Sequence, residues 1–259
     1  MKECEIYSNI KPPCGCKVVA RLDGRGFHRL TRELDFKRPY DPFFADCMVE
    51  TSINLMKEFS PIFIYTFSDE INILFEELPF NGRIEKLDSV LASFTGTSFI
   101  LCLLKKFKRD NIRKPISFDS RIIPLGDHLL VEYFKARQDE AWRNCLNSYA
   151  YWTLRETMDK KTATEKLKGL KSGDIHELLF ERGVNLAKVP TWHRRGIGVY
   201  KRIVTIKGYD PRYKKEVKSE RKRIVVDKKL PIFNEDFFKT IEGIKYGDYR
   251  LSSGENIWD

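Results

Sequence analysis

The sequence lacks the features of membrane proteins and of repeat proteins. No apolar run approaches the roughly 18 residues that cross a bilayer. The longest clear run extends from Phe99 to Leu104, and the N-terminus lacks the apolar stretch of a signal peptide. The chain contains no internal repeat and no low-complexity segment. We therefore expect a soluble, cytoplasmic protein without a membrane partner.

Cysteine and histidine are also sparse. Six cysteines among 259 residues do not form the disulfide framework of a small secreted protein. Cys14 and Cys16 form a C-x-C rather than the C-x-x-C of a zinc knuckle, and neither His28 nor His128 has a spacing that completes such a site. We expect reduced thiols and no structural zinc.

The chain is rich in apolar residues, and its positive charge is clustered. A hydrophobic share of 42% excludes a disordered chain, and the length suits one elaborated domain or two modest ones. Two clusters together exceed the net charge of +10: residues 201–229 contain twelve Lys/Arg against four Asp/Glu, and residues 105–114 contain six against one. Such clusters favour a polyanion such as nucleic acid, although a solvated face explains charge alone equally well.

The periodicity of the first half predicts the order β-α-β-β-α-β. We expect strands at 16–23, 62–67, 71–75 and 116–124, and helices at 42–60 and 83–107. This order is the split βαβ, ferredoxin-like unit, in which the first and third strands are neighbours. Asp23 ends the first strand and Asp69 lies between the second and third, so both should lie at one edge of the sheet.

Two carboxylates that meet at a sheet edge need positive charge between them if both are ionised. Hard oxygen ligands favour Mg²⁺. Gly24 has no side chain, so its carbonyl could approach the ion, and the N–H groups of Arg25, Gly26 and Phe27 could form a nest for a triphosphate. These parts resemble a polymerase palm, in which two metals act on an in-line phosphoryl transfer.

Each part has a purely structural alternative. Asp-Gly-Arg-Gly after a strand often forms a tight turn, and Ser68-Asp69-Glu70 consists of residue types that are common in hairpin turns. His28 could cap or pack rather than face phosphate. The aromatic residues between Trp142 and Trp152 are more often helix packing than base stacking.

The second half is expected to extend the palm. Asp127 begins a helical stretch to about Met158 with a break or bend, a shorter helix covers 172–181 and ends at Gly183, and strands at 198–206 and 221–226 are joined by a basic loop. The predicted fold is α/β (α+β), a ferredoxin-like βαββαβ polymerase-palm domain over 1–135 with a helical and β-hairpin extension over 136–259, packed on the palm as one unit.

At these residues the chain resembles the tRNA-His guanylyltransferase family, including its 3′-5′ polymerase relatives. The motifs that carry the resemblance are R-L-D-G-R-G-F-H-R from Arg21, Y-T-F-S-D-E from Tyr65, F-D-S-R from Phe118, R-Q-D-E-A-W-R-N-C-L-N-S-Y-A-Y-W from Arg137 and H-E-L-L-F from His176. Trp142 to Cys145 and Ile175 depart from the eukaryotic pattern and resemble the archaeal and bacterial branch.

The resemblance implies a site. Catalytic residues would be Asp23, Asp69 and Glu70, and two Mg²⁺ ions would bind Asp23, the Gly24 carbonyl and Asp69. The implied nucleotide-binding residues are Asp23, Gly24, Arg25, Gly26, Phe27, His28, Arg38, Ser68 and Asp69. We also expect RNA contacts at Arg137, Asn144, Lys214, Lys215, Arg221, Lys222 and Arg223.

The implied function is addition of guanosine to a tRNA 5′ end in the 3′-5′ direction. ATP or GTP would activate the 5′ end, and the 3′-OH of the incoming GTP would attack it in a Mg-dependent step. The tRNA would be tRNA-His or a 5′-truncated tRNA, and the protein would be a homotetramer. A palm-type nucleotide cyclase and a non-catalytic RNA-binding module are the alternatives.

Overall fold

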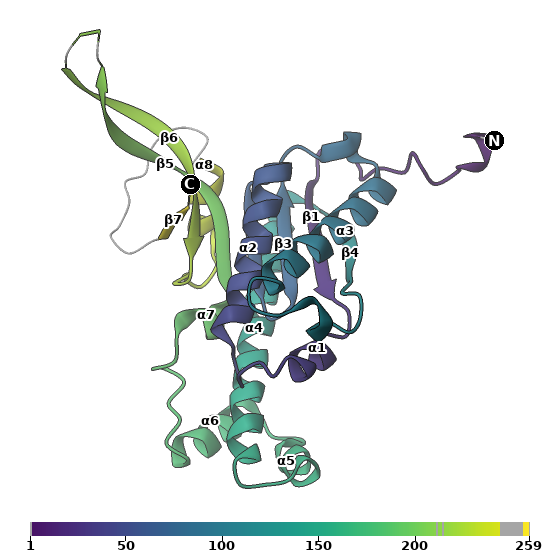
Figure 1. Ribbon diagram of the computed structural model, residues 1–259, viewed down its shortest axis with the longest axis vertical. Helices are drawn as coiled ribbons and strands as arrows, with labels where there is room; N and C mark the ends of the chain where they lie inside the picture. The colour runs from purple at the N-terminus through teal and green to yellow at the C-terminus, as the bar shows by residue number, and fades with distance from the viewer. Residues whose placement is uncertain (1, 211, 214, 244–255, 259) are drawn as a thin grey trace.

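The computed structural model describes residues 2–210, 212–213, 215–243 and 256–258. Within them, one antiparallel sheet has the strand order β4-β1-β3-β2-β5-β6-β7 (Figure 1). The strands are β1 Lys17–Gly24, β2 Phe63–Phe67, β3 Glu70–Phe75, β4 Phe118–Leu125, β5 Ile197–Asp210, β6 Lys215–Asp227 and β7 Asn256–Trp258. The α-helices are α1 Phe27–Glu33, α2 Pro42–Phe59, α3 Ile84–Leu103, α4 Asp127–Arg155, α5 Lys160–Leu167, α6 Ser172–Glu181, α7 Thr191–Arg195 and α8 Glu235–Gly243.

The first half has the predicted ferredoxin-like arrangement. β1 lies between β4 and β3, and its last residues pair in register, so that Asp23 is opposite Glu70 on β3 and Asp119 on β4. The first and third strands are therefore neighbours, as the element order predicts. α1, between β1 and α2, was not predicted.

The two long helices of this unit begin and pack for identifiable reasons. α2 begins where the Asp41 carboxylate accepts hydrogen bonds from the N–H groups of Phe43 (2.8 Å) and Phe44 (3.1 Å), which satisfies two free donors of the first turn. α3 is long and apolar enough to cross a membrane by length and composition. Its Leu87, Leu91 and Phe99 are instead buried in the core, as in a core helix of a soluble protein.

Alternating side chains of the strands form a core on each face of the sheet. On one face, Leu22 and Ile71 belong to a cluster that includes buried residues of α2 and α3. On the other face, Val19 and Leu74 pack with residues of α4 and α8. A third, small cluster joins the last part of α4 to α6. Because both faces are covered, a site on the sheet must lie at an edge or a strand end.

The second half differs from the prediction in several ways, and α5, α7, α8 and β7 were not predicted. α4 is one continuous helix of 29 residues, without the expected break, because buried residues recur along its whole length and pack on the sheet and then on α6. β5 and β6 pair from Gly198 and Asp227 to Asp210 and Lys215, so most of the expected basic loop is strand. Each strand satisfies the backbone groups of the other, and the hairpin can extend beyond the body (Figure 1).

The boundary between residues 135 and 136 falls inside α4, and β5 pairs with β2 of the first half. One helix and one sheet thus run through both parts. The division into two domains stays a prediction.

Candidate active site

The carboxylates of Asp23 and Asp69 lie at the end of β1 and in the turn before β3. The Gly24 N–H donates to the Asp69 carbonyl (3.1 Å), which holds the turn against the strand end. Burial raises the pKa of Asp69; the Ser68 hydroxyl, which donates to its Oδ1 (2.9 Å), opposes this, and the negative charge of Asp23 raises the pKa further. The structure therefore brings the two predicted carboxylates into electrostatic contact.

These two carboxylates fit a hard divalent cation. Neither Asp23 nor Asp69 forms an ion pair with a residue that the structure describes. Negative charge that is partly desolvated and not compensated favours a cation. The same part of the chain contains no group of three or more His, Cys, Asp and Glu side chains that could hold a metal. Other ligands would be a backbone carbonyl, water and phosphate oxygens, as magnesium-like ions accept.

Glu70 is held differently from the two aspartates. Its Oε1 accepts from the Asn72 amide (2.8 Å), and its Oε2 accepts from Arg137 on α4 (3.3 Å). Tyr133, also on α4, donates to the Asn72 carbonyl oxygen (2.6 Å). Burial raises the pKa of Glu70, while Asn72 and Arg137 lower it. This network ties α4 to the strand that follows Asp69, and Arg137, predicted as an RNA contact, lies in it with 16% of its side chain exposed.

The turn after Asp23 is shaped by its glycines and by Phe27. A Cβ at Gly24 would lie 2.4 Å from the Phe27 ring, and Gly26 has a φ of 75°. Phe27, the first residue of α1, is 3% exposed, and its ring contacts those of three core phenylalanines. The expected nest of three N–H groups is wrong at Arg25, whose N–H donates to the Ser117 carbonyl (2.9 Å). The N–H groups of Gly26 and Phe27 have no acceptor among the described residues.

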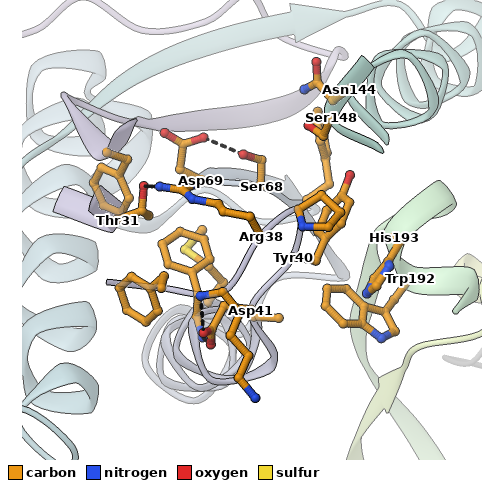
Figure 2. A pocket seen from close by; sticks show the side chains of 18 of the residues that line it. Thr31, Arg38, Tyr40, Asp41, Ser68, Asp69, Asn144, Ser148, Trp192 and His193 are labelled. Carbon is orange, nitrogen blue, oxygen red and sulfur yellow. Dashed lines mark hydrogen bonds between the residues drawn. The ribbon is translucent and has the colours of Figure 1, made fainter. Parts of the chain in front are cut away.

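A pocket of about 430 Å³, here called the aromatic pocket, opens beside Asp69 (Figure 2). Four predicted nucleotide-binding residues besides Phe27 line it: His28, Arg38, Ser68 and Asp69. Arg38 donates from Nη2 to the Thr31 hydroxyl (2.8 Å), and its guanidinium carbon lies 5.3 Å from the centre of the Trp152 ring. Burial lowers the pKa of Arg38, against the effect of Asp35 and Asp41. Arg38 is thereby held in place at the pocket by one hydrogen bond and one cation–π contact.

Further aromatic side chains line the pocket that sequence reasoning missed. Tyr40 stacks on His193 with ring centres 4.3 Å apart, and Trp192 meets Tyr40 edge-on at 5.7 Å. The Tyr149 hydroxyl hydrogen-bonds Nδ1 of His193 (2.7 Å), and burial lowers the pKa of His193 to about 4. The Trp192-His193 pair follows Pro190 in the sequence, but no spacing connects it with the other motifs.

The α4 motif divides between the pocket and the interior. Asn144, predicted as an RNA contact, lines the pocket together with Ser148 (Figure 2). Trp152, interpreted as more typical of helix packing, also lines it. Cys145 is buried, and Ile175 of α6 is buried in the third cluster. Ile175, where the sequence departs from the eukaryotic family pattern, thus lies in a hydrophobic core.

The predicted RNA contacts on the hairpin lie apart from the pocket. Lys215, Arg221 and Lys222 are exposed, whereas Arg223 is half-buried. Lys214 lies outside the described residues. In Figure 1 the hairpin points away from the end of the molecule that carries α5 and α6.

A sheet of this order with two carboxylates at a strand end is typical of palm-like nucleotidyltransferases, the class to which fold and site assign this protein. The family model of tRNAHis guanylyltransferase matches residues 1–126, and the model of the Thg1 C terminal domain matches residues 128–237. The chain belongs to the tRNA(His) guanylyltransferase family and is a nucleotidyltransferase.

Relatives and solved structures agree with this assignment. The tRNA(His) guanylyltransferase of Debaryomyces hansenii is 31% identical over 85% of this chain and 88% of its own length. A probable tRNA(His) guanylyltransferase of Mus musculus is 29% identical over 86% and 77%. A bacterial Thg1-like protein in complex with ATP has a TM-score of 0.73 at 26% identity, with 95% of this chain and 97% of that chain covered. The bacterial protein in complex with GTP has a TM-score of 0.69 at 25% identity, with 94% and 96% covered.

Proposed function

We propose that this protein adds guanosine to tRNA 5′ ends in the 3′-5′ direction. ATP or GTP activates the 5′-monophosphate as a nucleotide adduct with release of pyrophosphate. The 3′-OH of the incoming GTP then attacks the activated 5′-phosphate and releases the activating nucleotide as a nucleoside monophosphate. Pyrophosphate is afterwards removed from the new terminus. The observation that carries the proposal is a pocket whose lining combines aromatic side chains with Arg38, Ser68 and Asp69.

The aromatic wall suits a nucleobase. Tyr40 and Trp192 offer ring faces or edges, and Asn144 and Ser148 add hydrogen-bonding groups along α4. Base stacking on aromatic rings contributes about 1–3 kcal/mol per base. At neutral pH the low pKa of His193 keeps its ring neutral, so it adds a stacking face rather than a charge.

The polar part of the lining suits phosphates. Arg38 supplies a cation, and the free N–H group of Phe27 supplies an uncharged donor. The Ser68 hydroxyl, which now donates to Asp69, can turn toward a phosphate oxygen. Together they would hold the triphosphate of the activating nucleotide against the tRNA 5′-phosphate, which raises the effective concentration of the reacting groups.

Asp23, Asp69 and the Gly24 carbonyl would hold Mg²⁺, and we propose two ions. Bound there, Mg²⁺ neutralises charge on the phosphates and lowers the pKa of the attacking hydroxyl. Glu70 is a supporting acid: it anchors Arg137 and Asn72 and adds negative charge opposite Asp23. The resulting site orients a 3′-OH whichever strand carries it.

The test is incorporation of labelled GTP, with ATP and Mg²⁺, into two 5′-monophosphorylated transcripts. One is a full-length tRNA-His that lacks the additional 5′ guanosine, and the other is a tRNA that lacks its first paired nucleotide. Labelling of the first alone indicates tRNA-His maturation, and labelling of the second indicates templated 5′-end repair. If neither is labelled the proposal fails, and a cyclic nucleotide from GTP alone would replace it with a cyclase.

The proposal includes a homotetramer. Exposed apolar side chains are available for contacts between copies, among them Ile6, Tyr7, Leu101 and Leu104. Sedimentation at several protein concentrations measures the oligomeric state, and a monomer at all of them contradicts this part.

A further inference from the structure

A second hollow, here called the basic hollow, borders a different face of α1. Its volume is about 630 Å³, and residues 25–30, 32–33 and 113–117 line it. Glu33 is the carboxylate in its lining. Five cationic side chains line it: Arg25, Arg29, Arg32, Arg113 and Lys114.

The main chain that carries these cations is fixed on both sides. The Arg25 N–H donates to the Ser117 carbonyl (2.9 Å) and joins the two walls. Phe27 anchors α1 in the core with 3% exposure, and Ile112 and Phe118, on either side of the second wall, are 5% and 6% exposed. The hollow is thus a feature of the fold rather than a chance approach of two loops.

The cations of the basic hollow are not neutralised by the protein. Arg29, Arg32, Arg113 and Lys114 are exposed, and none forms an ion pair with another residue in the part of the chain that the structure describes. Like charges gathered in a concave surface reinforce one another and attract anions. A ligand with several negative charges is therefore favoured over a single carboxylate.

The lining offers contacts to phosphates and not to bases. Phe27, the aromatic residue of the lining besides the exposed imidazole of His28, is buried beneath α1 and presents no face to stack on. Arg29, Arg32 and Arg113 can each donate two parallel hydrogen bonds to a phosphate. Phosphate contacts position a nucleic acid without reading its sequence.

We propose that the basic hollow binds consecutive phosphates of the RNA strand whose 5′ end enters the aromatic pocket, an inference that rests on the proposed function. The two sites share Phe27 and His28 in their linings, so they adjoin, and a strand with its 5′ end in one lies beside the other. Free pyrophosphate has the same chemistry and is the other source of such a ligand.

The test uses the full chain with Arg29, Arg32 and Arg113 changed together to Gln. The matched control changes three exposed lysines of the α5 region, Lys160, Lys161 and Lys168, to Gln and so removes the same charge. Binding of a 3′-labelled, 5′-monophosphorylated tRNA is measured by fluorescence anisotropy without nucleotide, over a series of salt concentrations. Inhibition of GTP incorporation by pyrophosphate is measured in parallel, and thermal unfolding checks that both variants are folded.

We expect the arginine variant to bind tRNA about tenfold more weakly than the control variant. Its salt slope should fall by about 0.7 to 0.9 for each phosphate that the variant no longer neutralises. If tRNA affinity matches that of the control and only inhibition by pyrophosphate weakens, the ligand is free pyrophosphate and the RNA assignment is overturned. If neither changes in a folded variant, the hollow is not a phosphate site.

Failure of this inference and failure of the proposed function give different results. tRNA affinity is measured without catalysis, so it tests the basic hollow even in a protein that incorporates no GTP. A wild-type protein that labels no transcript contradicts the proposed function, and equal tRNA affinity of the two variants contradicts the basic hollow.

Discussion

The aromatic pocket and the basic hollow border one short helix and are built on opposite principles. In the aromatic pocket the side chains are ordered by one another: Arg38 is bound to Thr31 and lies over Trp152, and Tyr40 stacks on His193. In the basic hollow a backbone hydrogen bond joins the two walls, and the cationic side chains are exposed.

The difference teaches how one turn can serve two kinds of recognition. Preorganised rings and hydrogen bonds favour a ligand of one shape, because little freedom is lost on binding. Exposed cations without ion-pair partners favour any phosphate chain, because charge attraction needs no fixed geometry. Phe27 supports both, since its ring packs in the core under the first turn of α1. Changes at each site should therefore separate nucleotide chemistry from RNA affinity.

The largest effect should follow from Asp69→Ala at the edge of the aromatic pocket. GTP incorporation should fall by more than about 10³-fold, because the variant lacks a group that acts with Asp23 on the reacting phosphate. tRNA affinity should stay within about twofold, since the basic residues supply it. Single-turnover assays and anisotropy measure the two, with the surface variant Asp46→Asn as the control. A large decrease in tRNA affinity would show that the two sites are not separable.

Arg38→Ala should reduce the activation step by about tenfold to a hundredfold, because it removes the cation that we propose contacts phosphate. Arg38→Lys should restore little, since a lysine cannot keep both the bond to Thr31 and the position over Trp152. The measurement is formation of the activated tRNA from labelled ATP. An Arg38→Ala protein with normal activation would remove Arg38 from the phosphate end.

Gly24→Ala should damage both sites at once. Its Cβ would lie 2.4 to 2.8 Å from atoms of the Phe27 ring, and this buried ring can move only by shifting α1. Overpacking of this kind costs about 1–3 kcal/mol in the free energy of unfolding. Chemical denaturation measures it. Gly173→Ala is the control, because a Cβ there meets nothing within 4 Å, and equal stability of both variants would contradict the role of Phe27.

Charge on the β5–β6 hairpin should matter less than charge in the basic hollow. The triple variant Lys215→Gln, Arg221→Gln, Lys222→Gln removes exposed cations that lie away from both sites. We expect tRNA affinity to fall about threefold, with a smaller salt slope. Anisotropy over a salt series compares this variant with the arginine variant of the hollow. An unchanged slope would make the hairpin a solvated surface, and a larger decrease in affinity than at the hollow would reverse the comparison.

The smallest effect concerns pH, to which the aromatic pocket should respond through His193. Burial lowers its pKa to about 4, below the ordinary value of about 6.5. The unfolded chain therefore takes up the proton first as the pH falls, and stability should decrease between about pH 6.5 and pH 4. Over this pH range the melting temperature of His193→Phe should fall by about 2 to 4 °C less than that of the wild type, whereas that of His128→Phe should fall as much as the wild type's. Identical pH profiles would contradict a buried neutral His193.

The sequence predicted the central fold because its signals are local. Asp41-Pro42 begins α2, Gly183 with a φ of 79° ends α6, and the β-α-β-β-α-β order leaves few topologies. It missed α1, a helix of seven residues that follows Gly24 and Gly26 and precedes a loop, because so short a helix has little periodicity. It shortened the β5–β6 hairpin because cross-strand pairs, and not alternation, stabilise that ribbon.

The site was predicted where neighbours in space follow from topology. Asp23 and Asp69 meet because β1 and β3 are adjacent. Tyr40 and His193 are 153 positions apart, in segments without regular pattern, and their stacking could not be read from either segment. Arg25 illustrates the opposite error, since its N–H looked free in the motif and is bound to Ser117 across the chain.

By itself the sequence determined the β-α-β-β-α-β order of the first half apart from α1, the meeting of two carboxylates at a sheet edge and the family to which the chain belongs. These rest on hydrophobic periodicity, on capping and turn residues, and on contiguous motifs. Only the tertiary structure decided which aromatic residues form a pocket, which N–H groups are free and which cations gather beside α1. Those properties depend on side chains that are distant in sequence and brought together by burial, and local patterns carry no record of which partners burial will select.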